Sequence, residues 1–125
     1  MTDETGSVDA QLDRLLAASA PDVAAIAREL RAVVAESLPD RIEQVDFGNR
    51  LLAIGRSMKM RDLLFAIIPH TSHVNLQLAD GADLPNPDGL IEGTGKKIRH
   101  VKVRTLEAAR SAGVRGAIAE QLRVR

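Results

Sequence analysis

Hydrophobic residues in the first third of the chain recur at intervals of three and four positions, the spacing that places them on one face of a helix. Ser7 precedes the first set and belongs to the residue types that cap helix N-termini, so we expect a helix over residues 8–19. Pro21 and Pro39 bracket the second set, which predicts a helix over residues 22–38. The hydrophobic positions of the two helices are Val8, Leu12, Leu15 and Leu16, and then Val23, Ile26, Ala27, Leu30, Val33 and Val34.

From residue 42 onward the helical period is lost, and short runs that favour strands replace it. We expect strands over residues 44–47, 50–56, 62–68 and 73–79. Their connections are short, with Gly48 and Asn49 as a tight-turn signal, so the strands should form an antiparallel meander. The run LLFAII is hydrophobic throughout and indicates a central strand, whereas VNLQL alternates as a strand with one solvent-exposed face does.

The remaining third of the chain begins with a segment rich in Pro, Gly and Asp, residues 80–95, which we expect to be a long ordered loop. A last strand over residues 100–104 follows, then a short helix over residues 105–112 and a terminal helix. These elements predict an α+β fold, in which N-terminal and C-terminal helices cover an antiparallel sheet. We expect a flexible N-terminus (residues 1–6) and a single domain (residues 7–125).

Composition adds two exclusions to this picture. Hydrophobic residues make up 45% of the chain and charged residues 27%, which is ordinary for a globular domain. The absence of cysteine excludes disulfides, thiolate zinc sites and cysteine nucleophiles. The longest wholly apolar run, residues 63–68, is too short to cross a bilayer, and the acidic start is unlike a signal peptide. We therefore expect a soluble, cytoplasmic protein with no membrane partner.

The net charge of zero hides an uneven distribution. Residues 1–48 hold ten acids and four bases, a net charge of −6, and residues 49–125 hold seven acids and thirteen bases, a net charge of +6. Either the acids serve only to keep the N-terminal helices solvated, or the separated charges steer a charged ligand or partner.

The segment IEGTGKKIRHVKVR, residues 91–104, is the stretch most like a binding site. It is not a P-loop, because Leu90 and Lys97 occupy the places of the required glycine and hydroxyl residue. It is not a dinucleotide fingerprint either, because Ile98 replaces a glycine. Gly93 and Gly95 can adopt positive φ and turn their N–H groups toward an anion.

Basic residues continue beyond this glycine loop. Val101 and Val103 share one face of the expected strand, so His100, Lys102 and Arg104, which alternate with them, share the other. These three residues should form a continuous basic stripe with the loop. The candidate ligand-binding residues are Gly93, Gly95, Lys96, Lys97, Arg99, His100, Lys102 and Arg104. The alternative is structural, with the glycines shaping a turn and the stripe protecting an edge strand from aggregation.

Metal binding has less support in the sequence. His70, His73 and His100 offer imidazole ligands for zinc or iron, but no carboxylate at ligand spacing accompanies them. Among the acids, Asp22, Glu29 and Glu36 recur every seven residues, about 10 Å apart along a helix and too far to chelate one ion. Asp9 and Asp13 have the spacing to share a weakly held ion. We assign no metal site.

Catalysis and nucleic-acid binding are also poorly supported. No serine, histidine and acid combination and no paired-carboxylate site can be assigned from spacing, and no cofactor motif is present. Phe47 and Phe65 are the only aromatic residues, which argues against recognition of nucleic acid by base stacking.

The run HVNLQLADGADLPNPDGLIEGTGKKIRHVKV, preceded by LPD and DFGN, resembles the YdhG-like family of small bacterial domains of unknown function over residues 22–122. Its most specific part is G-x-G-K-x-x-R, met by Gly93, Gly95, Lys96 and Arg99. The resemblance implies an antiparallel sheet covered by helices and, from some members, a frataxin-like iron chaperone. Asn86 stands where the family usually has aspartate before the proline, so no role of that carboxylate is carried over.

Taken with the residues, this predicts a non-enzymatic binding or adaptor module without a cofactor. Its surface over residues 93–104 would take an anionic small molecule or an acidic protein partner. The alternative is a frataxin-like iron or metal chaperone.

Overall fold

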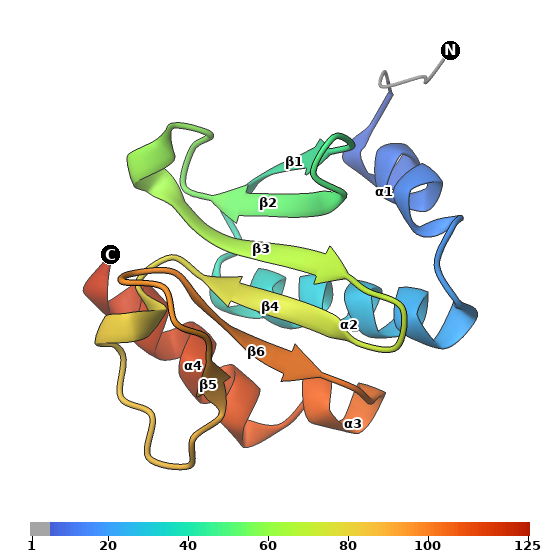
Figure 1. The fold of residues 1–125 in the computed structure, drawn as a ribbon. Coiled ribbons are helices and arrows are strands. Elements are labelled where there is room, and N and C mark those ends of the chain that lie inside the picture. The colour runs from blue at the N-terminus through green and yellow to red at the C-terminus, as the bar shows by residue number, and fades with distance from the viewer. Residues whose placement is uncertain (1–5) are drawn as a thin grey trace.

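The computed structural model describes residues 6–125, and its elements follow the predicted order (Figure 1). Two helices, four strands, a short strand, a further strand and two helices succeed one another. Their bounds are α1 (Val8–Leu16), α2 (Pro21–Ser37), β1 (Ile42–Asp46), β2 (Leu51–Gly55), β3 (Leu63–Pro69), β4 (Val74–Leu78), β5 (Ile91–Glu92), β6 (Arg99–Val103), α3 (Leu106–Ala109) and α4 (Ala112–Val124), with single 3-10 turns at η1 (Met60–Asp62) and η2 (Gly81–Asp83). The predicted flexible segment, residues 1–6, lies outside the described residues except for Gly6.

All six strands form one antiparallel sheet in the order β1-β2-β3-β4-β6-β5. The first four pair in chain order, which confirms the meander. β6 then pairs with the edge of β4 that β3 leaves open. β5 pairs with the first half of the opposite edge of β6, through Ile91 and Glu92. The segment over residues 80–95, predicted to be a loop, therefore contains a short strand. Because β5 pairs with the first half of β6, that half of β6 is not the sheet edge that the structural alternative assumed.

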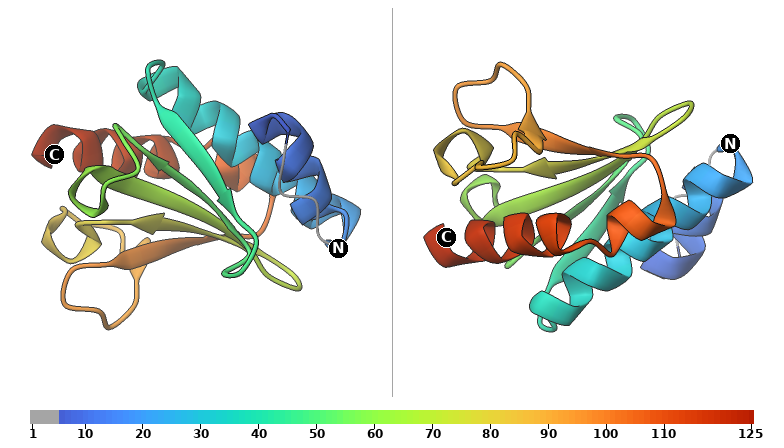
Figure 2. Two further views of the ribbon diagram at one scale, coloured as in Figure 1. Left: turned by 90° about the horizontal axis from the view of Figure 1, so that it is seen from above. Right: turned by 90° about the horizontal axis from the view of Figure 1, so that it is seen from below.

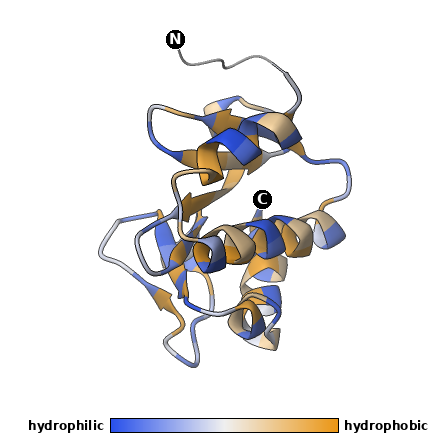
Figure 3. Ribbon diagram, turned by 90° about the vertical axis from the view of Figure 1, so that its right-hand side faces the viewer, coloured by the Kyte–Doolittle hydropathy of each residue, from blue (hydrophilic) through white to orange (hydrophobic). Residues whose placement is uncertain are grey.

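The helices lie on one side of the sheet, so the fold has two layers (Figure 2). The predicted hydrophobic stripe of α2 is confirmed as core, since none of its six side chains is more than 3% exposed, and α2 packs on β3 and β4. Hydrophobic residues are concentrated in the strands, while the helices carry hydrophobic and hydrophilic residues on different sides (Figure 3). From the sheet, the core takes Leu52, Ile54, Phe65, Ile67, Leu76, Leu78, Val101 and Val103.

Helix ends have local causes. The side chain of Ser7 accepts a hydrogen bond from Ala10 N at 3.1 Å, as predicted for a cap, and Thr105 does the same for α3. α1 stops at Leu16 rather than at the predicted residue 19, and a turn closed by a hydrogen bond from Ser19 N to the carbonyl oxygen of Leu16 follows it. Ala20, before Pro21, is extended. The helix predicted to reach residue 112 ends at Ala109, because Ser111 caps the start of α4.

The other face of the sheet carries no helix in the described part of the chain (Figure 2). On this uncovered face, residues that alternate with the core positions of β4 and β6 are half-buried, as the alternating pattern of β4 predicted. None of the helices within residues 6–125 combines the length and the apolar character needed to cross a membrane.

Candidate functional site

The glycine loop between β5 and β6 is tied to the turn at η2. Lys97 Nζ lies 3.0 Å from Asp83 Oδ2 and 3.4 Å from Asp80 Oδ1, and these hydrogen bonds raise the pKa of Lys97. Ala82 N donates a hydrogen bond to the carbonyl oxygen of Lys97 at 2.9 Å. The charge of Lys97 is thus balanced within the fold rather than presented to a ligand.

The two glycines of this loop differ from one another. Gly93 has a φ of +119°, as predicted. The prediction of positive φ is wrong for Gly95, which is glycine for a different reason: a Cβ there would lie 2.4 Å from the carbonyl oxygen of Ile98. The carbonyl oxygen of Gly95 also accepts a hydrogen bond from Arg99 Nε at 3.0 Å. Gly95 therefore allows the backbone of the loop to fold back on itself, and Arg99 stabilises that turn.

The predicted continuous basic stripe is wrong, because it is interrupted at Arg99. Arg99 is opposite Leu78 in the register and alternates with His100, so it lies on the helix side of β6. Gly81 leaves room for it, since a Cβ at Gly81 would lie 2.6 Å from the Cβ of Arg99. Lys96 is exposed, with no carboxylate partner among residues 6–125. The eight candidate residues are therefore not brought together.

The strand half of the candidate site does lie together on the uncovered face. Val101 and Val103 are buried on the helix side, which confirms that His100, Lys102 and Arg104 point the other way. Within the part of the chain that the structure describes, neither Lys102 nor Arg104 has an ion pair or a side-chain hydrogen bond. We call these three residues, with His70 and His73, the basic corner.

Two histidines join this corner from the turn between β3 and β4. The rings of His70 and His73 are stacked, with centroids 4.7 Å apart and planes 18° from parallel. Burial, followed by the positive charge of His70, lowers the pKa of His73 below its ordinary value of 6.5, and Lys102, Arg104 and His100 act in the same direction. A metal cation would meet the same repulsion. No group of three potential ligand residues within residues 6–125 is placed to hold one.

Two buried atoms of this region, His73 Nδ1 and Asn75 Oδ1, have no hydrogen-bond partner among the described residues. Asn75 is opposite Lys102 in the register of β4 and β6. A buried polar atom without a partner costs about 1–3 kcal/mol, so a bound group that hydrogen-bonds to either atom would recover part of that cost.

A groove of about 750 Å³ lies beside the basic corner on the uncovered face. Small residues line it, namely Ala53 of β2 and Ala66 of β3, which are paired, and Ala79, which follows β4. Met60 and Ile98, which are 84% and 53% exposed, stand at its sides. Sequence reasoning missed the groove, because alanines far apart in the chain reveal a hollow only when the strand register is known.

The charged residues along the groove are Arg61, Lys97 and Arg125, with Asp46 and Asp80. Asp80 is buried and accepts hydrogen bonds from Gln121 Nε2 at 2.7 Å and Arg125 Nε at 2.9 Å. Burial opposes ionisation of this carboxyl, but these hydrogen bonds outweigh it and lower its pKa. Lys97 and Arg125 are thus paired with Asp80, and Arg61 and Asp46 are the charged residues of the groove that have no ion pair within residues 6–125.

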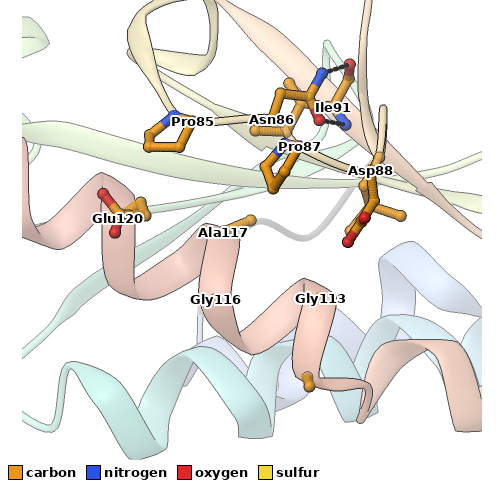
Figure 4. Close-up of a pocket in the computed structure, with 11 residues that line it drawn as sticks. Pro85, Asn86, Pro87, Asp88, Ile91, Gly113, Gly116, Ala117 and Glu120 are labelled. Atoms are coloured by element: carbon orange, nitrogen blue, oxygen red, sulfur yellow. Dashed lines mark hydrogen bonds between the residues drawn. The ribbon is translucent and has the colours of Figure 1, made fainter.

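A second pocket, of about 270 Å³, lies between residues 85–91 and α4 (Figure 4). The Asn86 amide donates to the carbonyl oxygen of Ile91 at 2.8 Å and accepts from its N–H at 2.9 Å, as a paired strand residue would. An aspartate could not donate, so asparagine suits this loop. The charged residues that line the pocket, Asp88 and Glu120, are acidic, which does not suit an anion.

Except for Asp22, whose carboxylate accepts a hydrogen bond from Val23 N at 2.9 Å, the acids considered as a loose metal-binding ridge are in ion pairs with arginines. The pairs are Asp9 with Arg31, Asp13 with Arg28, Glu29 with Arg110 and Glu36 with Arg115. Hydrogen bonds from the arginines lower the pKa of Asp9 and of Glu29. The expectation that Asp9 and Asp13 share an ion is not met, since each carboxylate is directed to its own arginine.

Comparisons with models of protein families, with curated proteins and with solved structures gave no match. The resemblance to the YdhG-like family therefore stays a prediction from the sequence.

Proposed function

We propose that this protein is a non-enzymatic binding module that holds the anionic group of a small molecule at the basic corner. The observation that carries the proposal is the gathering of Lys102, Arg104 and three imidazoles on one uncovered sheet face. The carboxylate opposite His100, that of Glu92, is exposed, and none of the five residues has an ion pair with a carboxylate among the described residues. Like charges held together repel one another, and a bound anion relieves that repulsion.

Several other basic residues of the fold are paired with carboxylates, although Lys96 and Arg61, like Lys102 and Arg104, have no ion pair within residues 6–125. Ten ion pairs within residues 6–125 join arginines and Lys97 to carboxylates. Lys102 is half-buried on a strand whose neighbours fix its position, so it is better placed than a mobile surface lysine to contribute to binding.

A binding role is favoured over catalysis because no carboxylate hydrogen-bonds to His70 or His73 in the described structure. An imidazole without such a partner lacks the orientation that serine and cysteine hydrolases give their base. The iron-chaperone alternative rests on the family resemblance, and the arginine pairing of the helix acids argues against it.

The test compares two double variants that each remove one lysine and one arginine. K102A/R104A alters the basic corner, and K96A/R99A alters the glycine loop. Inorganic phosphate is titrated into each protein at low ionic strength and followed by two-dimensional NMR. We expect shifts at His73, Asn75 and His100 in the original protein and in K96A/R99A, and their loss in K102A/R104A.

Shifts that survive K102A/R104A would contradict the proposal. Shifts confined to residues 93–97 would return the site to the glycine loop. If an acidic peptide shifts the NMR signals of the corner residues and phosphate does not, the ligand of the corner is a protein partner and not a small molecule.

A further inference from the structure

We infer that the ligand is an amphipathic anion, whose apolar part lies in the groove while its anionic group contacts the basic corner. This inference rests on the proposed function and specifies the chemical class of the ligand. The evidence for it is the groove that lies next to the basic corner, because the proposed binding of an anionic group at the corner gives the groove no role.

The groove exists because its floor is made of alanines on adjacent strands. Ala53 is paired with Ala66, so two small side chains lie side by side where larger residues would fill the hollow. Met60 and Ile98 rise at the sides and are largely exposed to water. A ligand with an apolar chain would cover both side chains, and each methylene group that it buries strengthens binding by roughly a factor of four.

The groove and the basic corner are adjacent through one pair of strand residues. Gln77 lines the groove and is paired with His100, the first residue of the corner on β6. Adjacent strands are about 4.8 Å apart, so His100 lies roughly 10 Å across the sheet from Ala66, and Lys102 roughly 7 Å farther along β6. A molecule with an extended chain of medium length spans that distance.

The size of the groove indicates a small molecule rather than a protein surface, and the basic corner supplies the charge that favours an anion over a neutral ligand. Along the groove itself, Lys97 and Arg125 are paired with Asp80, and Arg61 and Asp46 have no ion pair within residues 6–125. The volume of the groove is within the range of about 300–1,000 Å³ that is usual for small-molecule sites. A partner protein would instead cover about 800 Å² of surface.

The experiment uses three probes with calorimetry: decanoate below its micellar concentration, decanol, and acetate. Decanoate has both parts of the ligand, decanol has only the chain, and acetate has only the anion. The variant M60A/I98A removes the sides of the groove. Its matched control I42A/L106A truncates two other exposed hydrophobic residues, which are 47% and 39% exposed and lie outside the groove.

We expect decanoate to bind at least about tenfold more tightly than either decanol or acetate. M60A/I98A should weaken decanoate binding at least about tenfold and leave the phosphate-induced NMR shifts unchanged. K102A/R104A should weaken both, and I42A/L106A neither.

Decanoate binding no tighter than acetate binding would overturn the inference and leave the anion site intact. Equal affinity for decanol and decanoate would also overturn it. If decanoate binding survives K102A/R104A and phosphate shifts are absent, the proposed function fails as well. Comparable weakening by I42A/L106A would show that the effect of M60A/I98A is not local to the groove, and would likewise overturn the inference.

Discussion

Arg31 of α2 contacts Glu43 of β1 through two hydrogen bonds, from Nε to Oε2 at 3.0 Å and from Nη2 to Oε1 at 2.7 Å. Their side chains are only 19% and 9% exposed. Burial opposes ionisation of Glu43, but hydrogen bonds from Arg31 and Arg41 outweigh it, so its pKa lies below the ordinary value of 4.5. The pair joins the main helix to the first strand of the sheet.

Replacing Glu43 with glutamine should lower the free energy of unfolding by about 1.5–3 kcal/mol at neutral pH, the usual contribution of hydrogen bonds to a charged group. Because the pKa of Glu43 is lowered in the folded state, the difference from the original protein should be full above pH 4.5 and shrink as the pH falls through the folded-state pKa. Urea melts at several pH values measure this. Asp13→Asn, which breaks an exposed ion pair, is the control and should change stability much less. A difference that grows on acidification would contradict the assignment.

Leu30 is completely buried between α2 and the sheet. Leu30→Ala should cost about 2–5 kcal/mol, because a buried truncation loses apolar contact and leaves a cavity. Leu106→Ala, at a residue that is 39% exposed, should cost far less. Denaturant melts that give the two variants equal stability would remove Leu30 from the core.

The pKa of His73 should rise in K102A/R104A, since burial persists but two of the positive neighbours are removed. NMR titration of the imidazole signals measures it directly. The sign for stability follows from the lowered pKa: the unfolded chain binds the proton more readily, so the free energy of unfolding should fall as pH decreases below about 6.5. That acid sensitivity should be smaller in the double variant. An unchanged pKa would show that the cations do not act on His73.

Asp80→Asn should loosen the glycine loop as well as lower stability. The carboxylate receives hydrogen bonds from Gln121 and Arg125, and it lies 3.4 Å from Lys97 Nζ. We expect a loss of about 1.5–3 kcal/mol and faster hydrogen exchange at the amide of Ala82, which donates to the carbonyl oxygen of Lys97. Asp83→Asn removes the more exposed carboxylate of the same pair of acids and should have the smaller effect on both measurements. The reverse order would show that Asp83, and not Asp80, anchors the loop.

Ferrous iron should bind weakly, be displaced by salt and compete with magnesium. Weak binding should concentrate on the helix acids Asp9, Asp13, Asp22 and Glu29, of which all but Asp22 are already in an ion pair with an arginine. The histidines of the basic corner repel a cation. Anaerobic calorimetry measures this, and a tight stoichiometric site that disappears in H70A/H73A would make metal binding the leading function.

The fold was largely predictable because its signals are local. The stripe of α2, the caps at Ser7 and Thr105 and the meander all follow from residues a few positions apart. β5 was missed because it is only two residues long, too short to show an alternating hydrophobic pattern. Its outer edge is hydrogen-bonded by the side-chain amide of Asn86 and not by another strand.

The site was only partly predictable, because side-chain partners come from distant segments. Alternation placed His100, Lys102 and Arg104 on one face correctly. It did not show that Asp80 and Asp83 neutralise Lys97, or that Arg99 lies on the opposite side of β6. The spacing of His70 and His73 suggested metal ligands, and only the strand register shows that the residues beside them are cations.

The sheet order also has a consequence for how the chain acquires its structure. β1 to β4 are hairpins between neighbours in sequence, so they close short loops and can form early. β6 reaches β4 only after residues 79–98 have been looped out, at a greater entropic cost. Residues 99–103 complete the basic corner, and Ile98 completes the groove. By this argument the surface proposed to bind assembles after the meander, and a nascent chain that ends before residue 98 lacks residues that both the basic corner and the groove require.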